Sequence, residues 1–430
     1  MNILLAVLAL NLIIILHELG HFLVAKHFGI NVLEFSLFFG PKLFSIKRGE
    51  TTYSLRLIPV GAFVLTEGEE EEAEGEGSFS TQSLPVKAAV IAAGPAMNLF
   101  TALVFLCIVF SSIGYGTTKI NGITEGSPAD LAGLQPGDKI ISYNGKRVYQ
   151  PTDYLSFLMV GRGESSELQI LRNDQRMTVT VTPETIPSER YIVGFVSQEA
   201  YGKNSTVIRS IVPDSPAAAG GLQTGDQLIR MDGKAIHNKQ EISAYLAERR
   251  GAPVELTFLR NGTESKVRIT PVLEKGEPVY AVGLGFANEQ GSLFQVLRQS
   301  VVYTYSTMRN VVYTVGWLVT GKVSLTELMG PVRIVSTISN VVEASENNLK
   351  LIVINLLNIL AFISIALGGT NLLPFPALDG GRLLTLGISA VIRRPIPPQK
   401  EAVVSLIGLA FLMLLGIFTI FNDVIQLIFG

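Results

Sequence analysis

Two histidines and a glutamate lie close together near the start of the chain, in His17-Glu18-Leu19-Gly20-His21. On a helix, histidines four residues apart lie on one face about one turn apart, so both imidazoles can bind one Zn²⁺. The carboxylate of Glu18 can then take a proton from a water whose pKa the metal lowers to roughly 7. The alternative is a pair of capping or surface histidines beside a solvated glutamate.

The surroundings of this motif favour the metal site. Met1 to Leu16 carry no charged side chain, and polar groups in an apolar helix of bilayer length are costly and usually functional. The chain has a mean hydropathy of +0.39, and only 16% of its 430 residues are charged, so we expect a membrane protein. A net charge of -2 without a Lys/Arg cluster gives no indication of nucleic-acid binding.

Four stretches are long and apolar enough to cross the roughly 30 Å hydrocarbon core of a bilayer. They run over about Asn2–Ala25, Val90–Ile113, Leu351–Leu373 and Ala402–Phe421. The first lacks the basic start and cleavage site of a signal peptide, so we expect it to be retained. Ser292 to Gly321 is apolar but contains Arg298 and Arg309, so we expect it to lie in the membrane interface rather than to cross.

Shorter patterns predict three further features. Partly alternating apolar residues between about Asn31 and Val64, broken by Gly and Pro, predict short strands that lie against the membrane. Seven glutamates between Glu67 and Glu76 favour a solvated linker over a metal or partner site. In the second span, a Gly94-Pro95 break precedes Asn98, whose side chain we expect to hydrogen-bond to a neighbouring helix.

An internal duplication occupies the charged, glycine-rich stretch from about Lys119 to Pro271. Gly137-Asp138 recurs as Gly225-Asp226, and other pairs recur at the same offset (226 − 138 = 88). Each copy resembles the PDZ domain in its circularly permuted bacterial form. The resemblance implies a fold that adds an extended peptide as a strand or holds a peptide C-terminus by its carboxylate. The alternative is that one or both copies only occupy space outside the membrane.

A zinc hydrolase needs a third protein ligand and one open position for water. The best candidate for that ligand is Asp379, the only acidic residue in and around the third span. Pro374 and Pro376 break the helix beside it, and irregular backbone at membrane depth is tolerated only where it is buried in protein or lines a cavity. The alternative is an aspartate that only caps the following helix.

These motifs together resemble one family. H-E-L-G-H in the first span, N-x-x-P-x-P-x-L-D-G-G from Asn371 onwards and the PDZ copies between them are similar to the site-2 protease family of intramembrane zinc metalloproteases, of the bacterial regulator of sigma-E protease type. The resemblance covers essentially the whole chain. It implies that His17, His21 and Asp379 are zinc ligands, that Glu18 is the general base and that Asn371 contacts the substrate backbone.

The resemblance also implies a class of substrate. We expect hydrolysis of peptide bonds within or near the transmembrane segment of single-span membrane proteins, such as anti-sigma factors or signal-peptide remnants, after a first extracytoplasmic cut. Tyr53 to Phe63 is similar to the family's membrane-associated β-hairpin, and we expect unwound substrate to pair with an edge strand at Tyr53 to Ile58. The residues predicted to bind substrate are Asn371, Tyr53, Leu55, Leu57, Pro374 and Pro376.

The basic residues predict how the chain is oriented in the membrane. They gather in the two short connections between spans, which the positive-inside rule makes cytoplasmic. These residues are Lys26, Lys42, Lys47, Arg48, Arg56, Lys87, Arg382, Arg393, Arg394 and Lys400. The PDZ copies are then extracytoplasmic, and we expect the active site near the cytoplasmic side; the family resemblance implies that the membrane is the bacterial inner membrane.

We therefore predict a polytopic α-helical membrane protein with four spans, a membrane-associated β-hairpin and two extracytoplasmic α+β PDZ-like domains. The predicted parts are the first span with H-E-x-x-H (1–27), the hairpin and acidic linker (28–84), the second span (85–116), PDZ-like domains 1 (117–188) and 2 (189–276), an interfacial amphipathic segment (277–348), the third span with the L-D-G motif (349–392) and the fourth span (393–430).

Two other functions compete with the protease. One is a catalytically inactive scaffold that binds peptides through its PDZ copies, against which the complete set of His17, Glu18, His21 and Asp379 argues. The other is a transporter whose intramembrane polar residues relay ions. Four spans with a large external tandem of domains argue against a transporter.

Overall fold

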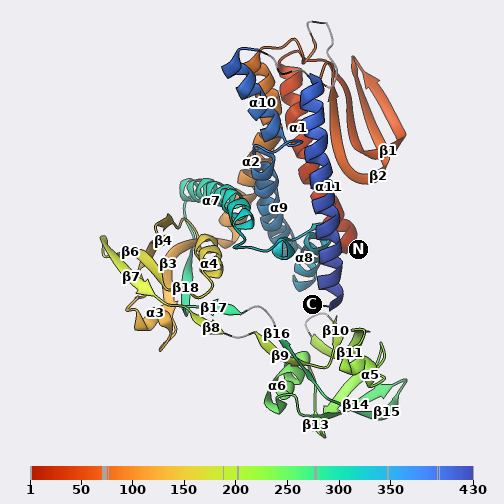
Figure 1. Cartoon of the computed structure of the whole chain (residues 1–430), viewed down its shortest axis with the longest axis vertical. Helices are drawn as coiled ribbons and strands as arrows, with labels where there is room; N and C mark the ends of the chain where they lie inside the picture. The colour runs from red at the N-terminus through yellow and green to blue at the C-terminus, as the bar shows by residue number, and fades with distance from the viewer. Residues whose placement is uncertain are drawn as a thin grey trace. The chain divides into compact units, whose positions relative to one another are not determined.

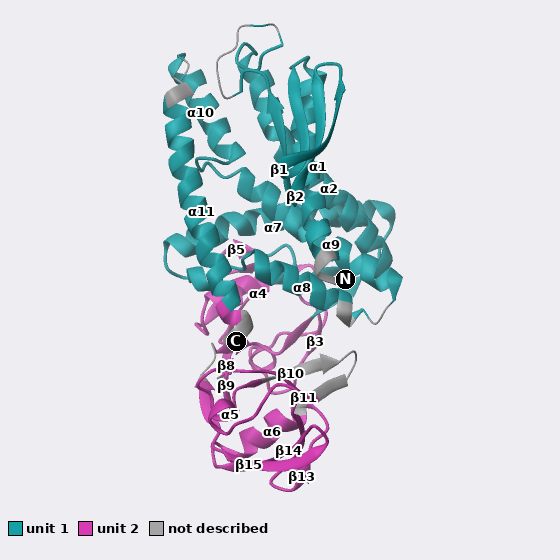
Figure 2. Cartoon of the chain, turned by 90° about the vertical axis from the view of Figure 1, so that its right-hand side faces the viewer, with its two compact units in different colours: residues 1–118, 148–153, 286–424 teal, residues 119–147, 154–285, 425–430 magenta. Residues whose placement is uncertain are grey.

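The computed structural model describes residues 2–69, 75, 77–186, 188–200, 203–275, 278–345, 348–394, 396 and 398–429. Most of the predicted acidic linker, residues 70–74 and 76, lies outside these ranges. The chain divides into two compact units, coloured separately in Figure 2. The first comprises residues 1–118, 148–153 and 286–424, and the second comprises residues 119–147, 154–285 and 425–430.

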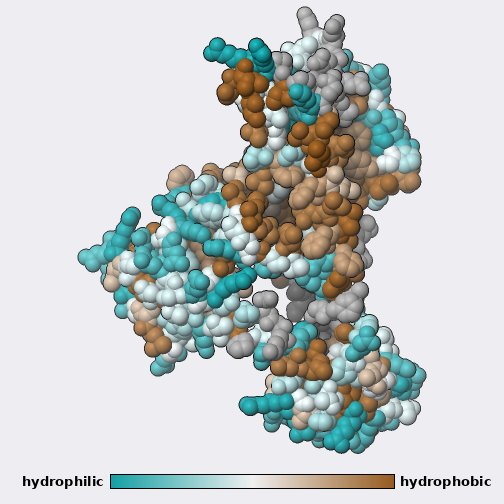
Figure 3. All heavy atoms as spheres, viewed as in Figure 1, coloured by the Kyte–Doolittle hydropathy of each residue, from teal (hydrophilic) through white to brown (hydrophobic). Residues whose placement is uncertain are grey.

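Long helices make up most of the first unit (Figure 1). Four of them contain stretches long and apolar enough to cross a membrane, which is the number predicted, and Figure 3 shows apolar residues gathered over α9, α10 and α11. The helices are α1 (Asn2–His27), α2 (Leu84–Ile113), α7 (Leu293–Val319), α8 (Pro331–Ala344), α9 (Leu349–Asn371), α10 (Asp379–Ile392) and α11 (Pro398–Phe429), with a 3-10 turn η1 (Leu325–Glu327). The candidate spans lie in α1, α2, α9 and α11.

Helix α2 is the centre of this unit, because α1, α7, α9 and α10 all pack against it. Glycines allow two of these approaches: a Cβ on Gly20 of α1 would lie 2.4 Å from the carbonyl oxygen of Ala93, and one on Gly368 of α9 would lie 3.1 Å from that of Pro95. Close packing of small residues is how helices associate in a medium without a hydrophobic driving force. The apolar core between α2, α7 and α9 includes Ala102, Leu106, Val109, Phe110, Val296, Ile354, Ala361 and Ile365.

Helix α7 buries several polar side chains and exposes several apolar ones. Ser300 and Ser306 are fully buried, whereas Phe294 and Val319 are 76% and 83% exposed. An exposed apolar side suits a helix in contact with lipid. The position of α7 in the membrane interface stays a prediction.

Strands β1 (Val32–Arg48) and β2 (Thr51–Thr66) form more than the predicted hairpin. Both strands bend, so residues 32–37 pair with 62–66 on one side and with 52–55 on the other, and 52–55 also pair with 44–47. The stretch that contains Tyr53 and Leu55 is therefore central, and the prediction that it is an edge is wrong. Alternation of apolar residues shows that a strand is half buried but not which strands flank it. Residues 62–66 pair with 32–37 and with no other strand among the described residues, so they form a free edge of the sheet.

Asn11 attaches this sheet to α1. Its Nδ2 donates to the carbonyl oxygen of Pro59 at 3.0 Å, and its Oδ1 accepts from the backbone N–H of Gly61 at 2.8 Å. Gly61 has a φ of 79°, and a Cβ there would lie 2.3 Å from the ring of Phe39. Asn11 is only 4% exposed. The buried amide of Asn11 thus holds β2 at Pro59 and Gly61, just before residues 62–66.

The elements of the second unit repeat with the offset found in the sequence. Strands β11, β12, β14 and β15 each begin 88 residues after β3, β4, β6 and β7 (203 − 115 = 227 − 139 = 254 − 166 = 263 − 175 = 88), which confirms the predicted duplication. The first copy contains β3 (Tyr115–Ile123), α3 (Pro128–Leu131), β4 (Lys139–Tyr143), β5 (Lys146–Arg147), α4 (Pro151–Val160), β6 (Ser166–Arg172) and β7 (Gln175–Val181). The second contains β11 (Lys203–Ile211), α5 (Pro216–Ala219), β12 (Gln227–Met231), β13 (Lys234–Ala235), α6 (Lys239–Arg249), β14 (Val254–Arg260) and β15 (Thr263–Ile269).

Each copy completes its sheet with a strand that follows the other copy. β10 (Phe195–Ala200) follows the first copy but pairs with β11, and β18 (Leu284–Glu289) follows the second copy but pairs with β3. The strand orders are β18-β3-β4-β6-β7 and β10-β11-β12-β14-β15. Between the copies, β8 (Glu184–Ile186) pairs with β17 (Val279–Ala281), and β9 (Glu189–Ile192) pairs with β16 (Val272–Lys275).

This exchange departs from two predicted boundaries. The first sheet is discontinuous in sequence, because β18 lies outside the predicted domain at 117–188. The segment predicted to be interfacial, 277–348, begins with strands, and its first helix starts only at Leu293. Each sheet takes one strand from beyond its own repeated stretch, and sequence periodicity alone does not show which sheet receives it.

The repeated Gly-Asp pairs have a structural role. Asp226 accepts hydrogen bonds from the backbone N–H of Gln223 at 2.8 Å and from Arg260 at 2.8 Å (Nε) and 2.7 Å (Nη2). Asp138 and Arg172 form the same arrangement in the first copy. Hydrogen bonds from Arg260 hold the pKa of Asp226 below its ordinary value, although burial opposes this. The repeated offset thus preserves, in each copy, an ion pair between a buried aspartate and a partly exposed arginine.

We expect Asp226→Asn to loosen the second copy at neutral pH. Because the folded-state pKa of Asp226 is lowered, its ion pair stabilises the fold above the unfolded pKa of about 3.9 and stops doing so as the pH falls through the folded value. Amide hydrogen exchange in β12 and β14 of the whole chain, compared between wild type and variant at each pH, should show a difference that shrinks below about pH 4. Asp138→Asn, the equivalent change in the first copy, should leave β12 and β14 unaffected. A difference that does not depend on pH would contradict this role of Asp226.

Candidate metal centre

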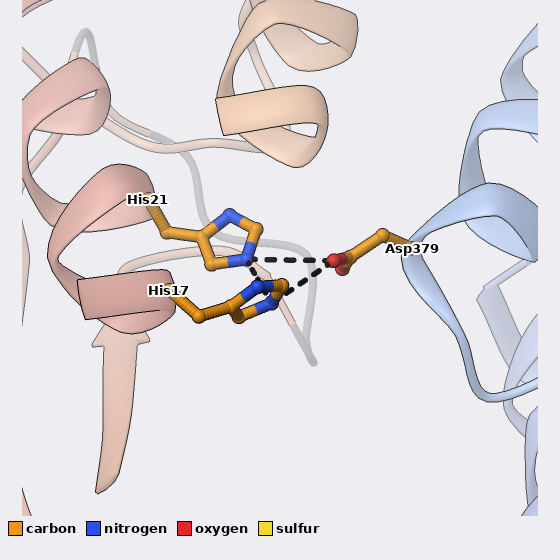
Figure 4. A group of neighbouring side chains, drawn as sticks. All are labelled: His17, His21 and Asp379. Atoms are coloured by element: carbon orange, nitrogen blue, oxygen red, sulfur yellow. Dashed lines mark hydrogen bonds and ion pairs between the residues drawn. The ribbon is translucent and has the colours of Figure 1, made fainter. Parts of the chain in front are cut away.

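Three predicted ligands converge in the first unit (Figure 4). His17 and His21 project from α1 toward Asp379, the first residue of α10. The Nε2 atoms of the two histidines are 3.3 Å apart. Asp379 Oδ2 lies 3.2 Å from His17 Nε2 and 3.6 Å from His21 Nε2. Residues from distant parts of the chain thus present three ligand atoms to one point.

The spacing of these atoms fits a zinc ion. In a tetrahedral site with bonds of about 2.0–2.2 Å, neighbouring ligand atoms lie about 3.4 Å apart. The three observed separations, 3.2 to 3.6 Å, bracket that value. Asp379 Oδ2 is buried and accepts no hydrogen bond from the described residues, as expected of an oxygen that faces a cation. Two imidazoles and one carboxylate leave the fourth position open for water.

The other nitrogen of each histidine also has a partner. His21 Nδ1 lies 2.8 Å from the carbonyl oxygen of Val90, to which it can only donate. His17 Nδ1 lies 3.1 Å from the side-chain amide of Asn98, whose Oδ1 has no other partner among the described residues. With that amide turned over, His17 Nδ1 donates to Oδ1. Both Nε2 atoms are then unprotonated and available to a metal, which is the usual support for histidine ligands.

Asn98 therefore makes the predicted contact with a neighbouring helix, and its partner there is the candidate ligand His17. Its side chain reaches α1, and its backbone carbonyl oxygen accepts a hydrogen bond from the Ser364 hydroxyl of α9 at 2.8 Å. The predicted hydrogen bond to a neighbouring helix is confirmed. That the neighbour is a candidate ligand could not be predicted from a Gly-Pro break and an amide alone.

Gly94 provides the space for the two imidazoles. A Cβ on Gly94 would lie 2.2 Å from His21 Nε2 and 2.7 Å from His17 Nε2. The backbone of α2 at Gly94 therefore forms a wall of the site at a distance that no other residue allows. This close approach explains the glycine in the Gly94-Pro95 pair more directly than a helix break does.

The backbone around Asp379 is equally tight. After α9 ends at Asn371, residues 372–378 fold back against the start of α10. A Cβ on Gly380 would lie 2.3 Å from the carbonyl oxygen of Leu373, and one on Gly381 would lie 2.2 Å from that of Phe375. The two glycines of the L-D-G-G motif thus allow the broken helix to place Asp379 opposite the histidines.

A pocket of about 290 Å³ lies beside the three ligands. Glu18 and Asn371 line it, and Asn371 Nδ2 is 3.4 Å from His17 Nε2. Val64 and Thr66, from the free edge of the β1–β2 sheet, line it as well. Among the described residues that line this pocket, none is Tyr53, Leu55, Leu57, Pro374 or Pro376. Pro376 instead faces α11, where a Cβ on Gly408 would lie 2.4 Å from its carbonyl oxygen.

Two charged residues at this pocket were not predicted as site residues. Glu69 accepts hydrogen bonds from Thr66 and from Arg382, and both Glu69 and Arg382 line the pocket. The only sequence signal for Arg382 is its position one turn after Asp379, on the same side of a helix. Glu69 is one of seven glutamates, so composition could not distinguish it. Asn11, which anchors the sheet edge, gave a signal that was not used: it is a lone amide in an uncharged span.

The chain is similar to known zinc metalloproteases over nearly its whole length. The model of peptidase family M50 matches residues 5–415. The zinc metalloprotease RasP of Geobacillus kaustophilus is 32% identical over 428 residues, which are 96% of this chain and 95% of the relative. The regulator of sigma-W protease RasP of Bacillus subtilis is 28% identical over 435 residues, 96% of each chain. Among solved structures, the HtrA3 PDZ domain bound to a phage-derived ligand is 17% identical, with a TM-score of 0.19, and the match covers 21% of this chain and 92% of that one.

We expect Gly94→Ala to weaken zinc binding. The added Cβ would overlap His21 Nε2 and push the imidazoles away from their shared point. Disturbing groups that support metal ligands typically costs about 10- to 100-fold in affinity. Competition of the purified protein with a chelator for zinc measures the loss.

Gly416→Ala is the matched control for this change. Gly416 also lies in a candidate span, and a Cβ there would meet nothing within 4 Å. It should bind zinc as the wild type does. Unchanged affinity in Gly94→Ala would show that the α2 backbone does not limit the site.

Proposed function

The chain belongs to peptidase family M50, the site-2 protease family of zinc metalloproteases, and from this we propose that it cleaves peptide bonds within or near the transmembrane segment of single-span membrane proteins. The family confirms the predicted metalloprotease and its Zn²⁺. One observation carries the finer proposal: His17, His21 and Asp379 meet among helices long and apolar enough to cross a membrane. Four such helices and bacterial relatives over nearly the full length also fit a multi-pass protein of the bacterial inner membrane.

We assign the reaction to the residues around the pocket. His17, His21 and Asp379 would hold Zn²⁺, which when bound would supply Lewis-acid chemistry: a polarised scissile carbonyl and a lowered pKa of the attacking water. Glu18 accepts a proton from that water and passes it to the nitrogen of the leaving amine. Asn371, at the same pocket, donates its amide to the substrate carbonyl.

Substrate binding is assigned to the edge at residues 62–66 instead of Tyr53 to Ile58. A helical substrate hides its peptide bonds, so a short stretch must unwind before cleavage, and its freed N–H and C=O groups need partners in a medium without water. A strand with one free edge supplies them by strand addition. Residues 62–66 pair only with 32–37, and two of them line the pocket that also contains Glu18.

The two repeated copies are assigned a role in selecting substrates. We propose that they are PDZ-like domains on the extracytoplasmic side that admit only substrates already cut there, by steric exclusion or by binding the new C-terminus. The Bacillus subtilis relative is named as a regulator of a sigma factor, so a single-span anti-sigma factor is the substrate class we propose, with signal-peptide remnants as the other.

Glu18→Gln should keep the metal and lose the reaction. The amide preserves the shape of the pocket but cannot accept the proton, and general acid–base groups contribute about 10²- to 10⁴-fold. Cleavage of a single-span substrate in detergent should fall by that factor while the zinc content stays at one per chain. Glu50→Gln, a change at an exposed glutamate in the β1–β2 turn, is the control. Full cleavage by Glu18→Gln would remove the proposed role of Glu18, and loss of zinc would make Glu18 a ligand instead.

Disulfide cross-linking tests the edge. In a Glu18→Gln chain whose single cysteine, Cys107, is replaced by Ala, Val64→Cys should cross-link to a substrate with a cysteine near its cleavage site. Leu55→Cys, in the central stretch, should not, because Leu55 already has backbone partners on both sides. Cross-linking at 55 in preference to 64 would place the substrate elsewhere on the sheet.

A further inference from the structure

A second, larger cavity lies beside the metal pocket and has no role in the proposed reaction. Its volume is about 1350 Å³, and it is lined by the start of α2, by α10, by the start of α11 and by residues between Val64 and Ser80. All of these belong to the first unit. The cavity shares Val64, Glu69, Ile91 and Arg382 with the metal pocket, so the two cavities have a common wall.

Basic side chains outnumber acidic ones in this cavity. Lys87, Arg382, Arg393 and Arg394 line it, against Glu69 and Glu401. Glu69 is paired with Arg382, and Glu401 accepts a hydrogen bond from Thr385 at 3.0 Å. Arg393 and Arg394 are exposed and form no ion pair within the described residues. Lys87 donates to the backbone carbonyl oxygen of Ser80 at 2.6 Å, so Arg393 and Arg394 are the two cations left for an anion from outside.

The walls between these charges are apolar and lie at the ends of candidate spans. Leu84 and Leu386 contribute to the lining. Leu84 begins the span in α2, and the span in α11 begins at Lys400, a few residues after Arg394. Val391 and Leu406, which follow the lining residues Ala390 and Ser405 in sequence, are 83% and 65% exposed. Cations around an apolar surface at the end of a span match a phosphate with hydrocarbon chains beside it.

We propose that this cavity binds the headgroup of an anionic phospholipid, with its phosphate at Arg393 and Arg394 and its chains along α10 and α11. The site would then connect the membrane to the metal pocket through Arg382, which holds Glu69 at the end of the substrate edge. The inference depends on the membrane location of the chain and not on the proposed cleavage, so a binding measurement tests it separately.

Native mass spectrometry of the whole protein from mixed micelles tests this site. With phosphatidylglycerol and phosphatidylcholine at equal ratio, the wild type should retain phosphatidylglycerol selectively. The double change Arg393→Gln and Arg394→Gln should lower that selectivity about 10- to 30-fold, since each basic residue near a lipid surface is worth roughly a tenfold change or less. The matched control is Lys47→Gln with Arg48→Gln, another adjacent and exposed basic pair, at the end of β1 and outside the cavity.

Each alternative has its own outcome. Equal losses in the two double variants would reduce the effect to general surface charge and overturn the site. Displacement of the lipid by millimolar inorganic phosphate would indicate an anion site that does not require a lipid. Displacement by a peptide copied from the cytoplasmic flank of a substrate would assign the cavity to the substrate instead. The zinc content of Glu18→Gln and its loss of cleavage test the proposed function and do not depend on any of these three results.

Discussion

The close packing of α2 against α1, which carries His17 and His21, and against α9 is the constraint on which this structure depends. Asp379 lies 358 residues after His21 (379 − 21 = 358). Its carboxylate must nevertheless come as close to both imidazoles as neighbouring ligand atoms of one metal ion do. Lipid gives helices no hydrophobic reason to associate, so this precision comes from packing. Gly20, Gly94 and Gly368 each bring α2 so close to a neighbour that one added methyl group would overlap another atom or press against it.

Much of the site was predictable because its chemistry restricts residue type and spacing. Two histidines one helical turn apart, a carboxylate beside them and an aspartate after a broken span leave few arrangements, and the structure brings His17, His21 and Asp379 together. The spans and the duplication were predictable for a similar reason, since hydropathy over some twenty residues and a fixed offset both survive changes of individual residues.

What the sequence did not predict is which partner each group meets. Asn98 and Asn11 are both lone amides in apolar helices, yet one supports a ligand and the other holds a sheet. The stretch around Tyr53 alternates as an edge strand would, but a central strand with one solvated face alternates too. Which segments pair depends on how their surfaces fit and on backbone hydrogen bonds. Neither of these produces a repeating pattern of residue types in the sequence.

The exchanged strands β10 and β18 bear on the order in which the chain is completed. A ribosome makes the N-terminal part first, and β18 begins 103 residues after β7 ends (284 − 181 = 103). Until then β3 lacks its outer neighbour, whereas β10 to β15 are contiguous and can close at once. The later copy therefore completes its sheet before the earlier one, and the nascent chain carries an unpaired β3 edge, open to mispairing, through the whole of that interval.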